Sequence, residues 1–120
     1  MMTTYFVDFE NVSDAGLLGI DNLAFGDEVY IFYSKNARKI SIESYKKIVA
    51  SSAFIHFVEV KVGSTNSLDV QLATFVGNKY KERANGNDVF CIVARDRIYE
   101  YVISFWQNKG IPIFQKKNML

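Results

Sequence analysis

The stretch that decides the fold runs from Thr4 to Asn11 and reads Thr-Tyr-Phe-Val-Asp-Phe-Glu-Asn. Its apolar run, Tyr5-Phe6-Val7, ends at the acidic residue Asp8. A short apolar run bounded by polar residues is typical of a strand buried on both faces, as in a parallel sheet. Carboxylates just past the carboxyl end of such a strand lie where open α/β sheets bind ligands. We therefore expect Asp8 to anchor a divalent-metal site.

The rest of the chain alternates between strand-like and helix-like segments. Strands are expected over residues 28–33, 53–60, 88–94 and 111–114. Helices are expected over 14–18 with Ser13 as cap, over 41–49 with Ile42, Tyr45 and Val49 as its apolar stripe, from 66 or 67 to 83, and from 98 onward. This alternation predicts an α/β domain over residues 1–120, with a five-stranded parallel sheet between two layers of helices.

The composition excludes several classes of protein. The 120 residues are 49% hydrophobic, yet no apolar run approaches the roughly 20 residues of a membrane span, and no signal peptide is evident. The single cysteine, Cys91, cannot form an intrachain disulfide, so a cytoplasmic location is expected. With one histidine, His56, the chain has too few nitrogen and sulfur ligands for a zinc site.

A parallel sheet brings the carboxyl ends of its strands to one edge, and this sorts the polar residues. The residues expected at that edge are Asp8, Glu10 and Asn11 after the first strand, Ser34, Lys35 and Asn36 after the second, Lys61 after the third, and Asp96 after the fourth. The longest helix also begins there, with Asn66 before it and Asp69 in its first turn. Asp27, Glu28 and Asp88 precede their strands and fall on the opposite edge.

Asp8, Asp69 and Asp96 form the candidate acidic site. Three carboxylates near 5 Å apart repel one another by roughly 3 kcal/mol per pair at an effective dielectric of about 20. Such a cluster calls for a cation or for shifted pKa values, and oxygen-only ligands favour Mg²⁺ or Mn²⁺. Two simpler interpretations stay open: Asp69 favours the helix dipole, and Asp96 caps the helix near Ile98.

Three motifs, taken in order, resemble the PIN-like nuclease superfamily, and most closely its NYN-like bacterial branch. They are Asp8-Phe-Glu-Asn11, Asn66-Ser-Leu-Asp69 and Ala94-Arg-Asp96. The resemblance covers the whole chain and implies a sheet ordered 3-2-1-4-5 and metal-dependent cleavage of RNA. It implies Asp8, Asp69 and Asp96 as the metal-binding acids with Glu10 in support, Asn11 as a polar site residue, and Ser34 or Asn66 as residues that orient a phosphate or ligand.

One departure from the family pattern favours a second function. Where the family often has Ser-x-Asp-x-Asp after strand four, this chain reads Ala94-Arg-Asp-Arg-Ile98, with one acid. The alternative to a ribonuclease is therefore a catalytically weak PIN-like module that binds RNA or a protein partner. A haloacid-dehalogenase-like phosphatase requires Asp-x-Asp after strand one, and a receiver domain requires an Asp after strand three. The chain offers Asp-x-Glu and Glu59-Val-Lys61 at these places, so both are disfavoured.

Basic and aromatic residues near the acidic edge suggest how RNA would be held. Lys35, Arg38 and Lys61 are candidates for phosphate contacts, with Asn36 beside them. Tyr33 and Tyr99 are candidates for base stacking. The large apolar and aromatic content of so small a chain also suggests a homodimer.

Overall fold

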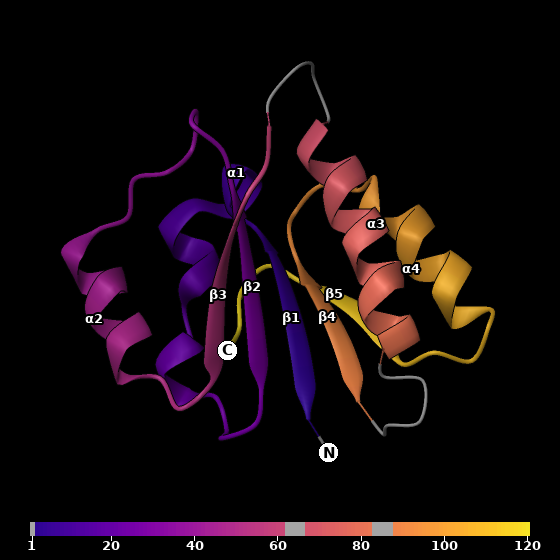
Figure 1. Ribbon diagram of the computed structural model, residues 1–120, viewed down its shortest axis with the longest axis horizontal. Helices are drawn as coiled ribbons and strands as arrows, with labels where there is room; N and C mark the ends of the chain where they lie inside the picture. The colour runs from indigo at the N-terminus through magenta and orange to yellow at the C-terminus, as the bar shows by residue number, and fades with distance from the viewer. Residues whose placement is uncertain (1, 62–66, 83–87) are drawn as a thin grey trace.

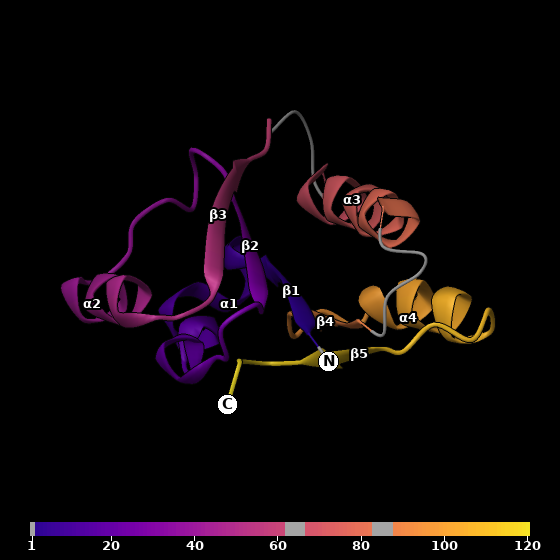
Figure 2. The same ribbon diagram turned by 60° about the horizontal axis from the view of Figure 1, so that its bottom comes forward.

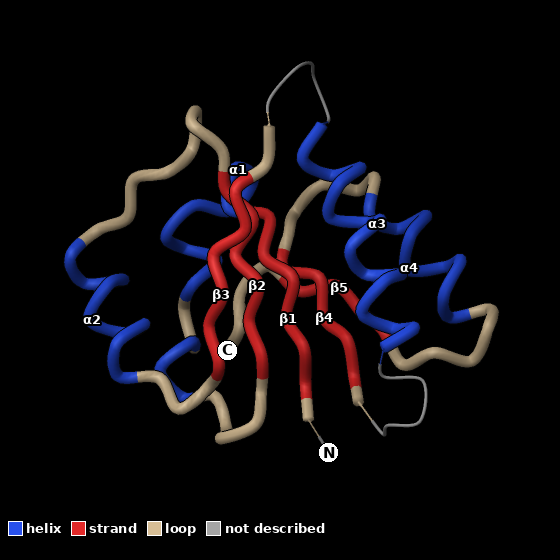
Figure 3. The backbone as a smooth tube through the Cα atoms, viewed as in Figure 1, coloured by secondary structure: helices blue, strands red, loops and turns tan. Residues whose placement is uncertain are grey.

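One parallel sheet organises the fold. The computed structural model describes residues 2–61, 67–82 and 88–120. Within these, the strands are β1 (Thr3–Asp8), β2 (Glu28–Tyr33), β3 (Phe54–Glu59), β4 (Val89–Val93) and β5 (Ile113–Lys116). They form a sheet with the order β3-β2-β1-β4-β5, and every neighbouring pair is parallel (Figures 1 and 3). The predicted five-stranded α/β sheet and its strand order are confirmed.

Helices cover both faces of the sheet. The helices α3 (Ser67–Glu82) and α4 (Tyr99–Gln107) lie on one face. The other face carries α1 (Phe9–Val12), the 3₁₀ turns η1 (Ser13–Leu17) and η2 (Ile20–Asn22), and α2 (Ile42–Ala50) (Figure 2). Successive side chains of β1 point to opposite faces of the sheet: Phe6 packs in the core beneath α3, and Val7 packs in the core beneath α1. In the part of the chain that the structure describes, no helix is long and apolar enough to cross a membrane.

The first helix differs from the one expected. A helix over 14–18 with a Ser13 cap was predicted, but α1 begins at Phe9 and is capped by Asp8, and residues 13–17 form a 3₁₀ turn. Ser13 has a φ of 54° and ends α1. Asp is among the best N-cap residues because its carboxylate accepts a backbone N–H of the first turn, and here this places Asp8 at the junction of strand and helix.

The apolar stripe of α2 also differs from the one expected. Ile42, Tyr45 and Val49 were predicted to face the core, but all three side chains are more than half exposed. Instead, the Ser44 and Ile48 side chains face inward, and Ile48 packs against the core beneath α1. Periodicity alone could not decide this, because both rows have helical spacing and the choice depends on how α2 packs against η2.

Gly19 allows the carboxyl-terminal segment to pack on the core beneath α1. Its φ is +95°, and an added Cβ would lie 2.4 Å from the Met119 carbonyl, beside the hydrogen bond from the Met119 N–H to the Leu18 carbonyl. We expect Gly19→Ala to lower the free energy of unfolding by about 2 kcal/mol in a urea titration. Gly110→Ala is the matched control, because Gly110 has a φ of +81° with nothing within 4 Å. It should cost about 1 kcal/mol, the backbone penalty alone. Equal losses in the two variants would contradict the clash at Met119.

Candidate active site

Asp8 lies where β1 ends, and its carboxylate is held from two sides. Its Oδ1 accepts the backbone N–H of Asn11 at 3.1 Å, and its Oδ2 accepts the Tyr99 hydroxyl at 2.8 Å. The Asp8 residue is 6% exposed and Tyr99 is fully buried. The orientation of this carboxylate is therefore fixed by the start of α1 and by the first residue of α4.

Glu10 is tied to the end of the neighbouring strand. The Ser34 hydroxyl donates to Glu10 Oε2 at 3.0 Å, and it accepts the backbone N–H of Asn36 at 3.2 Å. Ser34 is fully buried, whereas Glu10 is exposed. In this arrangement Ser34 orients the Glu10 carboxylate.

The loop after β4 is joined to the same edge by Asn11. The Asn11 side-chain oxygen accepts the backbone N–H of Arg95, so α1 and the residues before Asp96 are held together. Asp96 Oδ1 accepts the backbone N–H of Ile98 at 3.0 Å. This bond lies in the turn before α4, whose N-cap position is Ile98 and has no side-chain cap, so Asp96 does not occupy the N-cap itself. Its other carboxylate oxygen accepts none of the hydrogen bonds found within the described residues.

Asp69 carries a buried carboxylate oxygen without a partner. It lies in the first turn of α3 and is 8% exposed, and its Oδ1 makes no hydrogen bond within residues 2–61, 67–82 and 88–120. A buried oxygen that loses water and gains no donor costs free energy, of the order of 1–3 kcal/mol or more when charged. Such an atom is chemically suited to bind a cation.

The electrostatics indicate that these acids act on one another. Burial raises the pKa of Asp8 above its ordinary value of 3.8, and the charges of Glu10 and Asp69 raise it further, against the hydrogen bonds from Tyr99 and Asn11. Burial likewise raises the pKa of Asp69, with added repulsion from Asp96 and Glu10, against the backbone hydrogen bonds of Val70 and of Asp69 itself. Burial and the Asp8 charge raise the pKa of the Tyr99 hydroxyl, so this group stays a donor. The mutual repulsion is that expected of carboxylates gathered at one sheet edge.

The donor set fits a hard divalent cation in chemistry. The available atoms are carboxylate oxygens, which suit Mg²⁺ or Mn²⁺, and the unpartnered Asp69 oxygen is among them. Among the residues that the structure describes, no three His, Cys, Asp or Glu side chains are gathered closely enough to hold a metal ion. Asp8, Glu10, Asp69 and Asp96 are thus electrostatically coupled, and as metal ligands they stay a prediction.

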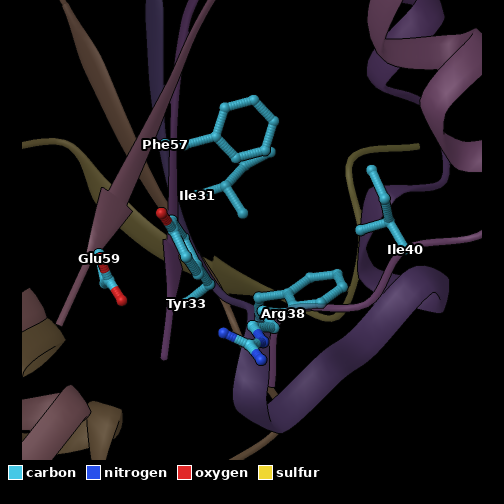
Figure 4. A pocket seen from close by; sticks show the side chains of 7 residues that line it. Ile31, Tyr33, Arg38, Ile40, Phe57 and Glu59 are labelled. Carbon is cyan, nitrogen blue, oxygen red and sulfur yellow. The ribbon is translucent and has the colours of Figure 1, made fainter. Parts of the chain in front are cut away.

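The predicted basic residues line two hollows on the β2–β3 side of the carboxyl edge. Lys35 and Lys61 line one, together with Glu59 and Val60. Arg38 lines the other, a pocket that also contains Tyr33 (Figure 4). Lys35, Asn36, Arg38 and Lys61 are all exposed and could meet a phosphate backbone. Asn66 lies outside the described residues.

Tyr99 was assigned the wrong role by sequence reasoning. The prediction that it stacks on bases is wrong, because the side chain is fully buried and its hydroxyl donates to Asp8. A signal for the correct role was available. Tyr99 comes three residues after Asp96, at the start of a helix, and the predicted topology places that helix start beside the end of β1.

The parallel sheet with acids at its carboxyl edge defines a class of α/β domains, and comparison with known families narrows it. A family model described as a PIN domain matches residues 2–116, and the chain belongs to this family. PIN domains are typically nucleases that act on RNA and use divalent metals. No curated protein and no solved structure gave a significant match. Membership of the narrower NYN-like branch stays a prediction.

Proposed function

We propose that this PIN domain is a metal-dependent endoribonuclease that hydrolyses phosphodiester bonds in RNA. The observation that carries the proposal is the unpartnered, buried Asp69 oxygen, on a carboxylate whose pKa is raised by burial and by Asp96 and Glu10. In this proposal Asp8, Asp69 and Asp96 hold Mg²⁺ or Mn²⁺, and Glu10 supports them. When bound, such a metal would polarise the phosphate and lower the pKa of water.

The chain's own residues would position the reactants. Tyr99 and Asn11 hold the Asp8 carboxylate in one orientation, and Ser34 holds Glu10. A fixed carboxylate loses little entropy when the substrate arrives, which favours catalysis. Lys35 and Lys61 would neutralise phosphates on either side of the cleaved bond, and so align the RNA across the carboxyl edge.

The second candidate is a module that binds RNA or a protein partner with little catalysis. The observation in its favour is Asp96, the one acid in Ala94-Arg-Asp-Arg-Ile98, whose Oδ1 is already used by the Ile98 N–H. A site that lacks one free ligand would bind metal more weakly. The homodimer and the cytoplasmic location expected from the sequence stay predictions beside either function.

Cleavage of a mixed RNA pool separates the two candidates. We expect the wild-type protein to cleave the pool in the presence of Mn²⁺ or Mg²⁺, and chelation by EDTA to stop cleavage. The products are resolved by gel electrophoresis at several times, and heat-denatured protein is the control for contaminating nuclease. If the protein retains RNA in a mobility-shift assay but leaves it intact with either metal, the binding module takes the place of the nuclease.

A further inference from the structure

A pocket with a volume of about 480 Å³ lies next to the acidic edge, within the range of small-molecule sites. It opens on the face of the sheet that α1 covers, and it is lined by aromatic rings, aliphatic side chains and two charges of opposite sign. Figure 4 shows Phe57, Ile31 and Tyr33 along the strands on one side, with Ile40 across from them. The Arg38 guanidinium and the Glu59 carboxylate flank the Tyr33 ring in this view.

The pocket shares its elements with the candidate active site. Phe9, which lines the pocket, lies between Asp8 and Glu10 in the sequence. Tyr33 immediately precedes Ser34, whose hydroxyl donates to Glu10. Glu59 also lines the hollow that contains Lys35 and Lys61. A nucleotide whose phosphate lies at the acidic edge would therefore have a neighbouring base within reach of the pocket.

The aromatic rings are suited to hold a flat ligand. Tyr33 and Phe57 pack edge to face, with ring centroids 6.4 Å apart at 77°. The Phe57 residue is 53% exposed, so its ring is open to a ligand in the pocket. The parallel register places Phe57 beside Ile31 and Glu59 beside Tyr33 on the same face. The Tyr33 ring is half-buried, and stacking of a nucleobase on such rings is worth about 1–3 kcal/mol.

The two charges select among the bases. Neither the Arg38 nor the Glu59 side chain has a hydrogen bond or an ion pair within the described part of the chain, and both are exposed at the pocket. Guanine offers two adjacent donors, N1–H and the N2 amino group, which match a carboxylate. It also offers two acceptors, O6 and N7, which match a guanidinium. Adenine would bring its N1 acceptor against the carboxylate, and the pyrimidines lack the O6/N7 pair.

We propose that this pocket binds a guanine base, with Glu59 accepting from its N1–H and N2 amino groups and Arg38 donating to its acceptor edge. Resting on the proposed ribonuclease function, the pocket would direct cleavage to phosphodiester bonds next to guanosine. Tyr33 and Phe57 supply stacking, so they set affinity, and the two charges set specificity.

Nucleotide binding tests the pocket without any cleavage. We expect metal-free protein to bind guanosine 5′-monophosphate at least about tenfold more tightly than the adenosine, cytidine and uridine monophosphates in isothermal titration calorimetry. Since all four carry the same phosphate, the difference reports the base. Glu59→Gln and Phe57→Ala should each weaken guanosine monophosphate binding about tenfold.

Two matched controls distinguish the pocket from a general surface effect. Phe54→Ala removes a ring of similar exposure, 55%, from the same strand, but Phe54 points to the other face and contacts Phe25. Glu43→Gln removes an exposed carboxylate from α2. Neither change should alter nucleotide affinity. Equal affinity for the four nucleotides, or unchanged affinity in Glu59→Gln and Phe57→Ala, overturns the guanine pocket.

The RNA-cleavage assay, combined with the nucleotide-binding experiment, tests this proposal and the nuclease proposal separately. If RNA is cleaved with a guanosine preference that Glu59→Gln removes, both stand. If guanosine monophosphate binds at the pocket but no metal-dependent cleavage occurs, the nuclease proposal fails and the pocket remains. If cleavage occurs without base preference and no nucleotide binds selectively, the pocket fails and the nuclease proposal remains.

Discussion

Asp8→Asn and Asp69→Asn are each expected to lower the rate of RNA cleavage at least about 100-fold, while the metal-free proteins stay at least as stable as the wild type. The substitution keeps the side chain's size, and Asn serves as well as Asp at the N-cap position that Asp8 occupies. What it removes is a buried charge, and with it a metal ligand. At position 8 the Tyr99 hydroxyl can rotate to accept the Asn amide N–H, so this pair stays hydrogen-bonded. A functional acid cluster shows this opposition between activity and stability, whereas an Asp with only a capping role would lose stability.

The raised pKa of Asp69 predicts how the stability of the metal-free protein changes with pH. The pKa of Asp69 in the folded protein lies above its ordinary value of 3.8, mainly because of burial. A raised folded-state pKa means that the folded chain holds the proton more tightly than the unfolded chain. The resulting stabilisation is complete below about pH 3.8 and is lost as the pH rises through the folded-state pKa. The melting temperature of metal-free wild type should therefore fall relative to Asp69→Asn as the pH rises from 4 to 7.

Bound metal should reverse this order of stability between the wild type and the variants at neutral pH. At a Mn²⁺ concentration of about 100 times its dissociation constant, the wild type should gain about 2.7 kcal/mol of stability, and the two variants should gain little. Asp88→Asn is the control, because Asp88 precedes β4 on the opposite edge of the sheet. It should cleave RNA and respond to Mn²⁺ as the wild type does. A wild-type melt that ignores Mn²⁺, together with full cleavage by both variants, would exclude the acidic site.

The sheet could be predicted because its signals are local and repeated. The four strands β1 to β4 are short runs rich in β-branched and aromatic residues, and β1 is the clearest, ending at Asp8. The handedness rule for parallel strands then leaves few ways to arrange the segments, and the family resemblance supplied the order. The same logic sorted the acids by strand end, which is why Asp8 and Glu10 were expected together.

The features that escaped prediction depend on three-dimensional packing. Which row of α2 faces the core is decided by packing against the η2 turn, so the exposed side chains of Ile42 and Tyr45 could not be foreseen from spacing. The hydrogen bond from the Tyr99 hydroxyl to the Asp8 carboxylate joins residues that lie 91 positions apart in the sequence. No short-range sequence pattern could predict it. The guanine pocket likewise combines three segments, and its Phe57 and Glu59 look like ordinary strand residues.

Tyr99→Phe is expected to weaken both the fold and the activity through Asp8 alone. The change removes one hydroxyl and leaves the ring in place, so no cavity forms in the core. Asp8 Oδ2 then loses its donor at 2.8 Å while still buried, which should cost about 1–3 kcal/mol of stability at neutral pH. With one side of the carboxylate released, cleavage and Mn²⁺ affinity should each fall about 10–100-fold, the usual effect of losing a residue that orients a ligand.

The pH–rate profile identifies Tyr99 as a positioning residue rather than a merely structural one. Its hydrogen bond lowers the pKa of Asp8 against the effect of burial, so removing it should raise that pKa. If Asp8 must be ionised for cleavage, the acidic limb of the profile should move to higher pH in Tyr99→Phe. Tyr101→Phe is the matched control, since Tyr101 lies in the same helix with its side chain 79% exposed, and it should leave both limbs in place. Loss of stability in Tyr99→Phe with an unmoved acidic limb and unchanged Mn²⁺ affinity would mean that the hydroxyl only supports the core, because ionisation of Asp8 would then be independent of it.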